Sequence, residues 1–123
     1  MIQIEVKQFD LEYERNMSTQ YSFIELHHDY FKYCASYDSE IPKDKEDLGM
    51  GWVSIYNEFE LCFKRHYLVS IEKWWVDLKD YWIIEIEING YPNTLKLHII
   101  SKEEMQKTYN TLFDYIILNK PCQ

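Results

Sequence analysis

Residues 82–100 alternate apolar and polar side chains on both sides of Gly90. A period of two is typical of a β-strand with one buried face, and Gly90, Tyr91, Pro92 and Asn93 supply the residue types of a four-residue turn. The pattern therefore predicts an antiparallel hairpin. Because a hairpin with one apolar face must bury that face against another element, this stretch constrains the fold more than any other.

The side chains of this hairpin favour one register. Pairing Ile88 with Leu95 gathers the isoleucines and leucines of both strands on one face. The other face then brings opposite, or potentially opposite, charges together across the strands. These pairs are Glu87 with Lys96 and Glu85 with His98. We predict this register and interpret the charged side as a solvated sheet face.

A helix is predicted directly after the hairpin. Ser101 can cap its first amides, and Glu104 stands where a capping box requires an acidic residue. Apolar residues then recur at three- and four-residue steps, at Met105, Tyr109, Leu112, Phe113 and Ile116. We expect an amphipathic helix over residues 102–118 that packs this stripe on the apolar face of the hairpin.

The preceding part of the chain contains further strand patterns. Short alternating or β-rich runs occur at residues 2–6, 52–56, 59–64 and 67–74. Residues 21–35 fit neither helical nor strand spacing cleanly, and we prefer the strand. Residues 38–51 combine charge, Pro and Gly without periodicity, so we predict a long loop there.

These elements add up to one predicted fold. The chain has 123 residues, which is the usual size of a single domain with one core. We predict the α+β class: a mainly antiparallel β-meander or partly open roll, closed by a C-terminal amphipathic helix. The single domain covers residues 1–123.

The order of the last elements resembles the end of a PH or GRAM-type domain. The resemblance covers roughly residues 65–119 and rests on a meander, a hairpin and one helix introduced by Ser-Lys-Glu-Glu at residues 101–104. It implies a partly open β-roll closed at one end by the helix. Many such domains bind phosphoinositides through basic residues in an early loop, and others bind proteins. Here residues 2–20 hold only Lys7 and Arg15 as basic residues, so no lipid-site residue is carried over.

Charge and cysteine usage narrow the class of partner. The formal net charge is −8, so nucleic acid and anionic membranes would be repelled, and the expected partner is a basic protein. No apolar run approaches the roughly twenty residues that a membrane span requires. The N-terminus lacks the pattern of a secretory signal, and the 3 cysteines are not closely spaced, so we expect a reduced, cytoplasmic protein.

The sequence contains no motif of an active centre. It has no Gly-rich phosphate loop, no nucleophile elbow and no paired-histidine zinc motif. The His27-His28-Asp29 run is interpreted as partly exposed and structural, and Cys62, four residues before His66, as a small core residue. We therefore expect no enzyme activity, no metal ion and no cofactor. A cryptic hydrolase would need a deep pocket that joins His27 or His66 to an acidic residue.

Aromatic residues make up 17% of the chain, more than a domain of this size is expected to bury. Tyr and Trp are enriched at protein interfaces, and the densest aromatic run is residues 73–82. In a strand, Trp74 and Trp75 point to opposite faces, so one arrangement buries Trp74 and exposes Trp75, and the alternative buries both. The predicted protein-binding residues are Trp75, Tyr81, Asp77, Asp80, Glu46 and Asp47.

The sequence thus predicts a small acidic intracellular protein that binds another protein and blocks its surface. In class it is similar to immunity proteins and phage-encoded anti-defence inhibitors. Carboxylates would steer a basic toxin, nuclease or defence effector, and exposed aromatic rings would anchor it. The alternative is a PH-like adaptor or lipid-sensing module without catalytic activity. Homodimerisation through the aromatic surface competes with both.

Overall fold

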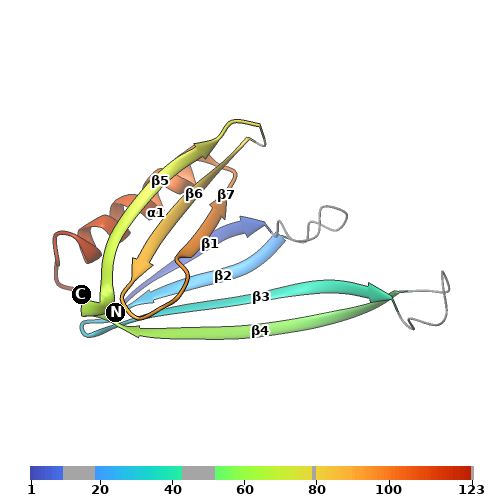
Figure 1. Cartoon of the computed structure of the whole chain (residues 1–123), viewed down its shortest axis with the longest axis horizontal. Coiled ribbons are helices and arrows are strands. Elements are labelled where there is room, and N and C mark those ends of the chain that lie inside the picture. Colours follow the sequence, from blue (N-terminus) through green and yellow to red (C-terminus); the bar gives the residue numbers. More distant parts are fainter. Residues whose placement is uncertain (10–18, 43–51, 79, 123) are drawn as a thin grey trace.

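A computed structural model describes residues 1–9, 19–42, 52–78 and 80–122 (Figure 1). The fold is α+β, with two open antiparallel sheets and one C-terminal helix. The first sheet contains, in spatial and chain order, β1 Ile2–Phe9, β2 Thr19–Leu26, β3 Tyr30–Pro42 and β4 Trp52–Lys64. After the 3-10 turn η1, Arg65–Tyr67, the second sheet contains β5 Leu68–Val76, β6 Tyr81–Ile88 and β7 Leu95–Ile99. The helix α1 is Lys102–Ile116.

Alternating side chains build the first sheet, as the sequence predicts. Val6 of β1 is buried and its neighbour Glu5 is exposed. The strand interpretation of residues 21–35 is confirmed, with a turn at residues 27–29 between β2 and β3. The inward-facing residues of these two strands are buried on the core side of the first sheet. They are Ser22, Ile24, Leu26, Phe31, Tyr33 and Ala35.

The long loop predicted at residues 38–51 is wrong for residues 38–42. Residues 38–42 continue β3 and pair with the start of β4, and residues 43–51 lie outside the described residues. Since β2 pairs with β3 only as far as Ser36, β3 and β4 extend as a two-stranded arm beyond β1 and β2 (Figure 1). Periodicity misses such an extension because it reports a buried face, whereas strand pairing is a property of the backbone.

The helix covers the apolar face of the second sheet, as predicted. Ser101 Oγ accepts a hydrogen bond from the amide of Glu104 at 3.3 Å, which confirms the cap. Met105 and Leu112 are buried, and the other predicted stripe residues pack partly against the core. The buried side of α1 also includes Thr108 and Tyr115, which the predicted stripe omitted. The sheet residues beneath it are Ile84, Ile86, Ile88, Leu95, Leu97 and Ile99.

The register between β6 and β7 differs by two residues from the prediction. Leu95 faces Ile86 rather than Ile88, and Lys96 accordingly faces Glu85. A shift of two residues keeps every side chain on its face. The predicted faces are therefore right, and the predicted charge pairs are wrong.

The register shift follows from how β5 holds the end of β6. The amide of Asn89 donates to the carbonyl of Tyr67, just before β5, at 2.7 Å. The chain turns where the amide of Tyr91 donates to the carbonyl of Ile88 at 3.1 Å and Gly90 adopts a φ of 82°. The end of β6 thus pairs with β5 alone, a contact that the hairpin sequence by itself does not contain.

A buried glutamine joins the two sheets. Gln8 of β1 is 3% exposed, and its Nε2 donates to Ser22 Oγ at 2.9 Å and to Tyr33 Oη at 2.6 Å. Its Oε1 accepts from the amide of His98 on β7 at 3.0 Å. Ser22 Oγ in turn donates to the carbonyl of Val6 at 2.7 Å. Because both ends of the buried amide have partners, this network fixes β1 beside β7 at little desolvation cost.

Candidate protein-binding surface

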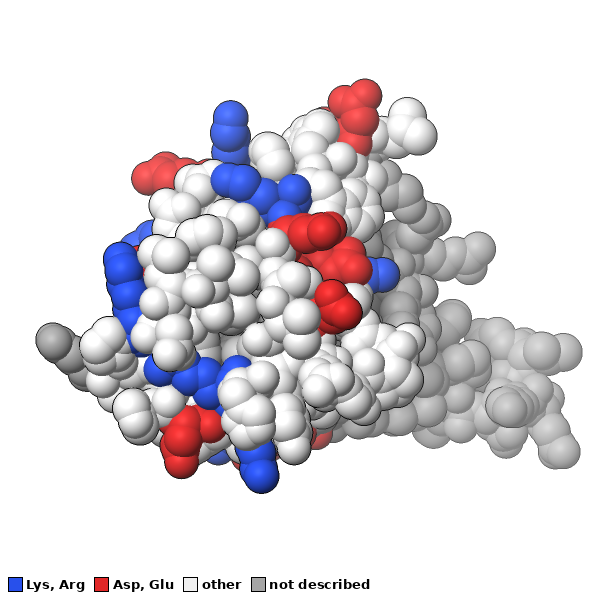
Figure 2. Space-filling view, turned by 60° about the vertical axis from the view of Figure 1, so that its left-hand side comes forward, with Lys and Arg blue, Asp and Glu red and all other residues white. Residues whose placement is uncertain are grey.

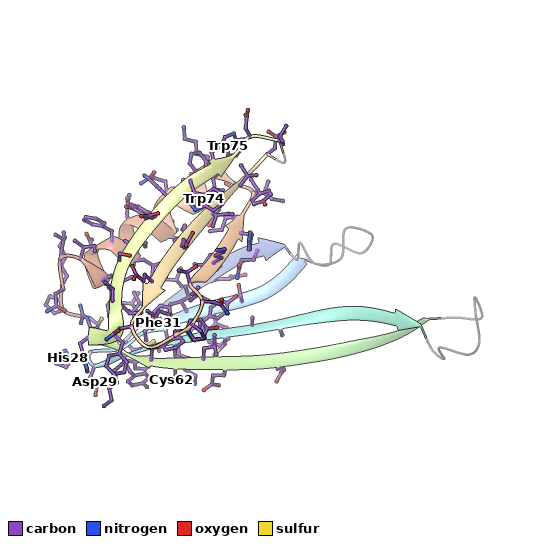
Figure 3. All side chains as sticks on the ribbon, viewed as in Figure 1. His28, Asp29, Phe31, Cys62, Trp74 and Trp75 are labelled. Atoms are coloured by element: carbon purple, nitrogen blue, oxygen red, sulfur yellow. The ribbon has the colours of Figure 1, made fainter. Side chains whose placement is uncertain are left out.

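Two adjacent tryptophans near the end of β5 remain partly exposed (Figure 3). Trp74 keeps 41% of its surface accessible and Trp75 keeps 40%. The sequence allowed one or both indoles in the core, and neither is there. The reason is that β5 is the edge strand of its sheet and pairs only with β6. On both faces of the sheet, the side chains at its end therefore have cross-strand neighbours on one side only.

Trp75 lies on the face that α1 covers further along the sheet. Its ring packs against Trp82 of β6, with centroids 5.1 Å apart, and its Nε1 donates to Asp77 Oδ1 at 3.4 Å. On the same face, Lys73 Nζ donates to Gln106 Oε1 of the helix at 2.7 Å. The helix therefore engages this face at Lys73 and leaves Trp75 half-exposed.

Trp74 lies on the opposite face of the second sheet, among carboxylates. Its Nε1 donates to Glu85 Oε2 at 3.3 Å, and the hydroxyl of Thr94 donates to the other carboxylate oxygen at 2.9 Å. Glu72 of β5 faces Glu85 directly across the strand pair, and Glu87 belongs to the same face. We call Glu72, Trp74, Glu85 and Glu87 the acidic outer face.

The carboxylates of the acidic outer face form no ion pair within the described part of the chain. Glu72, Glu85 and Glu87 form no ion pair there, although Lys96 faces Glu85 from β7. Figure 2 shows a compact group of carboxylates that has Lys or Arg side chains close by and borders a largely uncharged surface. Like charges that face each other across strands destabilise a sheet, so this arrangement is explained better by a cationic partner than by stability.

The turn between β5 and β6 adds a further apolar contact. Leu78 is 97% exposed and stands between the exposed residues Asp77 and Asp80. Asp80 has a φ of 54°, a left-handed conformation that Asp tolerates better than most residues. We call Trp75, Asp77, Leu78 and Asp80 the tip. The predicted residues Trp75, Asp77 and Asp80 are thus brought together on one turn.

The remaining predicted residues do not join this surface. Tyr81 is only 7% exposed because it lies on the central strand β6, where its ring meets that of His98 at a centroid distance of 5.8 Å. Its assignment as a surface contact is corrected. Glu46 and Asp47 lie outside the described residues.

Sequence reasoning missed the acidic outer face. The hairpin pattern places Glu85 on the charged side of the sheet, as the structure does. It does not identify the residues of β5 that lie next to Glu85. Glu72 and Trp74 reach it only through the β5–β6 register. The usable signal was the alternation of Glu72 and Trp74 along one strand, which places both on the same side.

A second candidate site lies at the opposite end of β5. Figure 3 places His28 and Asp29 there, far along the strand from Trp75. A cavity of about 450 Å³ opens at this point, between the β2–β3 turn, η1 and the end of α1. It is lined by His28, Asp29, Arg65, His66, Leu68, Tyr115, Ile116 and Asn119. It therefore holds histidines and a carboxylate, as a cryptic hydrolase would require.

The guanidinium of Arg65, which lines this cavity, binds backbone carbonyls. Arg65 Nη2 donates to the carbonyls of Tyr115 and Lys120 at 3.0 and 2.6 Å, and Nη1 donates to the carbonyl of His28 at 3.3 Å. The guanidinium carbon lies 3.9 Å from the centroid of the Tyr115 ring. A cation bound to carbonyls at a helix C-terminus also opposes the negative end of the helix dipole.

Tyr115 adds further hydrogen bonds to backbone carbonyls in this region. Its hydroxyl oxygen lies 2.7 and 2.9 Å from the carbonyl oxygens of His27 and Tyr30, which share its one proton, and this contact ties the helix to the β2–β3 turn. Burial raises the pKa of Tyr115 above its ordinary value, and Arg65 opposes that shift. His27 is itself engaged, with its ring 2.8 Å from Glu25 Oε1 and stacked on Tyr30. The contacts of this region hold α1, η1 and the β2–β3 turn together.

The cavity lacks the arrangement that nucleophilic catalysis needs. Neither His28 nor His66 has its ring hydrogen-bonded to Asp29, and no serine or cysteine lines the cavity. Across the described ranges, no group of three or more His, Cys, Asp or Glu is placed to hold a metal ion. The acidic outer face and the tip are therefore the stronger candidate.

Within the described residues, none of the helical segments has the length and apolar character of a bilayer span. No family model, curated protein or solved structure matches the chain. The resemblance to PH or GRAM-type domains accordingly stays a prediction.

Proposed function

We propose that this protein is a small acidic inhibitor or neutraliser that binds a basic protein and blocks its surface. One observation carries the proposal: the half-exposed Trp74 lies beside Glu72 and Glu85, and neither carboxylate forms an ion pair among the described residues. An aromatic anchor with adjacent charge is the usual composition of an interface hot spot.

The preformed hydrogen bonds of Glu85 support this proposal. Trp74 Nε1 and the Thr94 hydroxyl each donate to one oxygen of its carboxylate. They fix the position of the charge before a partner arrives, and they leave further lone pairs for a cation. Little side-chain entropy is then lost at this residue on binding.

The charge of the whole chain supports the same class of partner. With a net charge of −8, the protein attracts a basic partner over long range and raises the rate of encounter. A basic toxin, nuclease or defence effector fits this description. Binding should therefore weaken as salt is added, because screening reduces the attraction between exposed charges.

The test is affinity purification of the tagged protein from its native host, followed by binding and inhibition assays with the retained protein. We expect one basic protein to be retained, and its activity to be blocked. Trp74→Ala should weaken binding by about thirtyfold or more, as truncation of a hot-spot residue does. Charge reversal by Glu72→Lys should weaken binding more at low salt than at high salt, because salt screens the lost attraction.

Glu60→Gln is the matched control, because Glu60 is an exposed carboxylate on the first sheet, where it pairs with Lys32 at 3.0 Å. This variant should bind as the wild type does. If Trp74→Ala retains the partner equally well, the proposed surface is wrong. Selective co-sedimentation of the wild type with anionic liposomes would favour the PH-like lipid-sensing alternative instead.

A further inference from the structure

We infer that the partner contributes an extended segment that adds to the free edge of β5 as a further strand, along residues 72–76. This inference rests on the proposed function and specifies the mode of binding. β5 is the terminal strand of the second sheet, and nothing pairs with its outer side in the described sheet (Figure 1). An unpaired edge offers backbone donors and acceptors to another chain.

The burial pattern of β5 shows where the edge is open. Its four consecutive residues Glu72, Lys73, Trp74 and Trp75 are all exposed. Successive side chains of a strand point to opposite faces, so exposure at consecutive positions means that both faces are open along this part of the edge. The preceding residue Ile71 is buried, which sets the lower limit of the site.

The two tryptophans favour strand addition over docking on one face. Trp74 belongs to the acidic outer face, and Trp75 belongs to the face that carries α1. A partner lying flat on either face would cover one indole and leave the other in solvent. A strand beside β5 places side chains on both faces and covers both indoles at once.

The charges on each face predict the composition of the added segment. On the outer side it meets Glu72, with Glu85 behind it, so alternate positions should be Lys or Arg. On the other side it meets Trp75, packed on Trp82, while Lys73 is already bonded to the helix. Positions on that side should be apolar or aromatic. The segment therefore alternates basic and apolar residues.

A second copy of this chain fits the edge less well in the registers centred on Glu72 or on Lys73. Two β5 strands related by a two-fold axis normal to the sheet would pair antiparallel, with residues of the same face opposite each other. A pairing centred on Glu72 or on Lys73 sets like charges against each other, which destabilises a sheet. A basic alternating segment avoids this conflict.

The test uses a short synthetic peptide that alternates lysine and valine, and a control peptide of the same composition with its lysines and valines in two blocks. We expect the alternating peptide to bind and the block peptide to bind at least tenfold more weakly. Trp74→Ala and Trp75→Ala should each weaken binding by roughly tenfold or more, since each indole loses a contact. Amide hydrogen exchange within residues 72–76 should slow in the complex.

Three outcomes would overturn strand addition. Equal binding of the block peptide would mean attraction by charge alone. Normal binding by Trp75→Ala, with loss in Trp74→Ala, would mean docking on the outer face, and the proposed function would stand. Failure of the alternating peptide to bind would reject the edge site, whereas retention of a basic protein that depends on Trp74 would still support the proposed function. Thermal unfolding of both variants checks that they remain folded.

Discussion

The two ends of β5 differ in how their side chains are used. At its start, Arg65 and Tyr115 place their polar groups on backbone carbonyls of three separate segments. At its end, the indoles of Trp74 and Trp75 stay half-exposed, and each makes one long hydrogen bond to a carboxylate, at 3.3 and 3.4 Å. One strand thus joins a region arranged for stability to a region whose apolar surface is left uncovered.

The charges at the two ends differ in the same way. At the start, a guanidinium neutralises the C-terminal end of a helix. At the other end, Glu72 and Glu85 face each other, and neither forms an ion pair within the described residues. Repulsion that a sheet tolerates at an exposed site is typical of residues kept for binding rather than for folding.

Replacing the cation at the start of β5 should have the largest effect. Arg65→Ala removes hydrogen bonds to three carbonyls and the stacking on Tyr115. We expect the free energy of unfolding to fall by about 3 kcal/mol, because bonds to charged groups are lost and carbonyls lose their partners. Urea unfolding measures this change.

Trp75→Ser is the control at the other end of the strand and should lower the free energy of unfolding by about 1 kcal/mol or less, since its ring is already half in solvent. Equal losses for the two variants would remove the distinction between the two ends of β5.

Alkaline pH should lower the free energy of unfolding, in part through Tyr115 at the start of β5. Burial raises the pKa of Tyr115 above its ordinary value of 10.0. Above about pH 10, the unfolded chain loses this proton while the folded chain keeps it, so the free energy of unfolding falls as pH rises. One such group contributes a slope of at most about 1.4 kcal/mol per pH unit.

The measurement is urea unfolding at a series of pH values from neutral to alkaline. Tyr115→Phe should be less stable at neutral pH, because its hydrogen bonding to two carbonyls is lost, yet its stability should decline less steeply. An unchanged slope in Tyr115→Phe would mean that other groups cause the decline. Buried Tyr33, whose pKa is also raised by burial, is the next to substitute.

The smallest expected effect is a gain in stability at the other end. Glu72→Gln removes a like-charge pair across β5 and β6, so the free energy of unfolding should rise by about 0.3 kcal/mol. Binding of the basic partner should weaken in the same variant. Thermal unfolding and titration calorimetry measure the two changes, and a loss of stability would show that Glu72 has a structural role instead.

Side-chain alternation and capping were enough to predict much of the fold. They placed the strands, assigned the faces of the hairpin and positioned the start of α1 at Ser101. The reason is that each of these features depends on residues close together in the chain. The two-residue error between β6 and β7 is instructive, because it left all faces correct while changing every cross-strand neighbour.

The candidate site was less accessible to prediction. The sequence identified Trp75, Asp77 and Asp80, which share the tip, but it also chose Tyr81, which the central strand buries. It did not identify Trp74 with Glu72, because their grouping with Glu85 depends on pairing between strands. Exposure of a side chain depends on the position of its strand within a sheet, and local pattern does not contain that position.

The sequence by itself determined the class of secondary structure, the sides on which side chains lie, and the acidic, aromatic character of the protein. These follow from neighbouring residues and from composition. Only the tertiary structure decided that β5 is an edge, that its two indoles remain half-exposed, and that two carboxylates face each other beside one of them. The physical reason is that strand order and register arise from contacts between distant segments, whose energies are fixed only when the whole core packs.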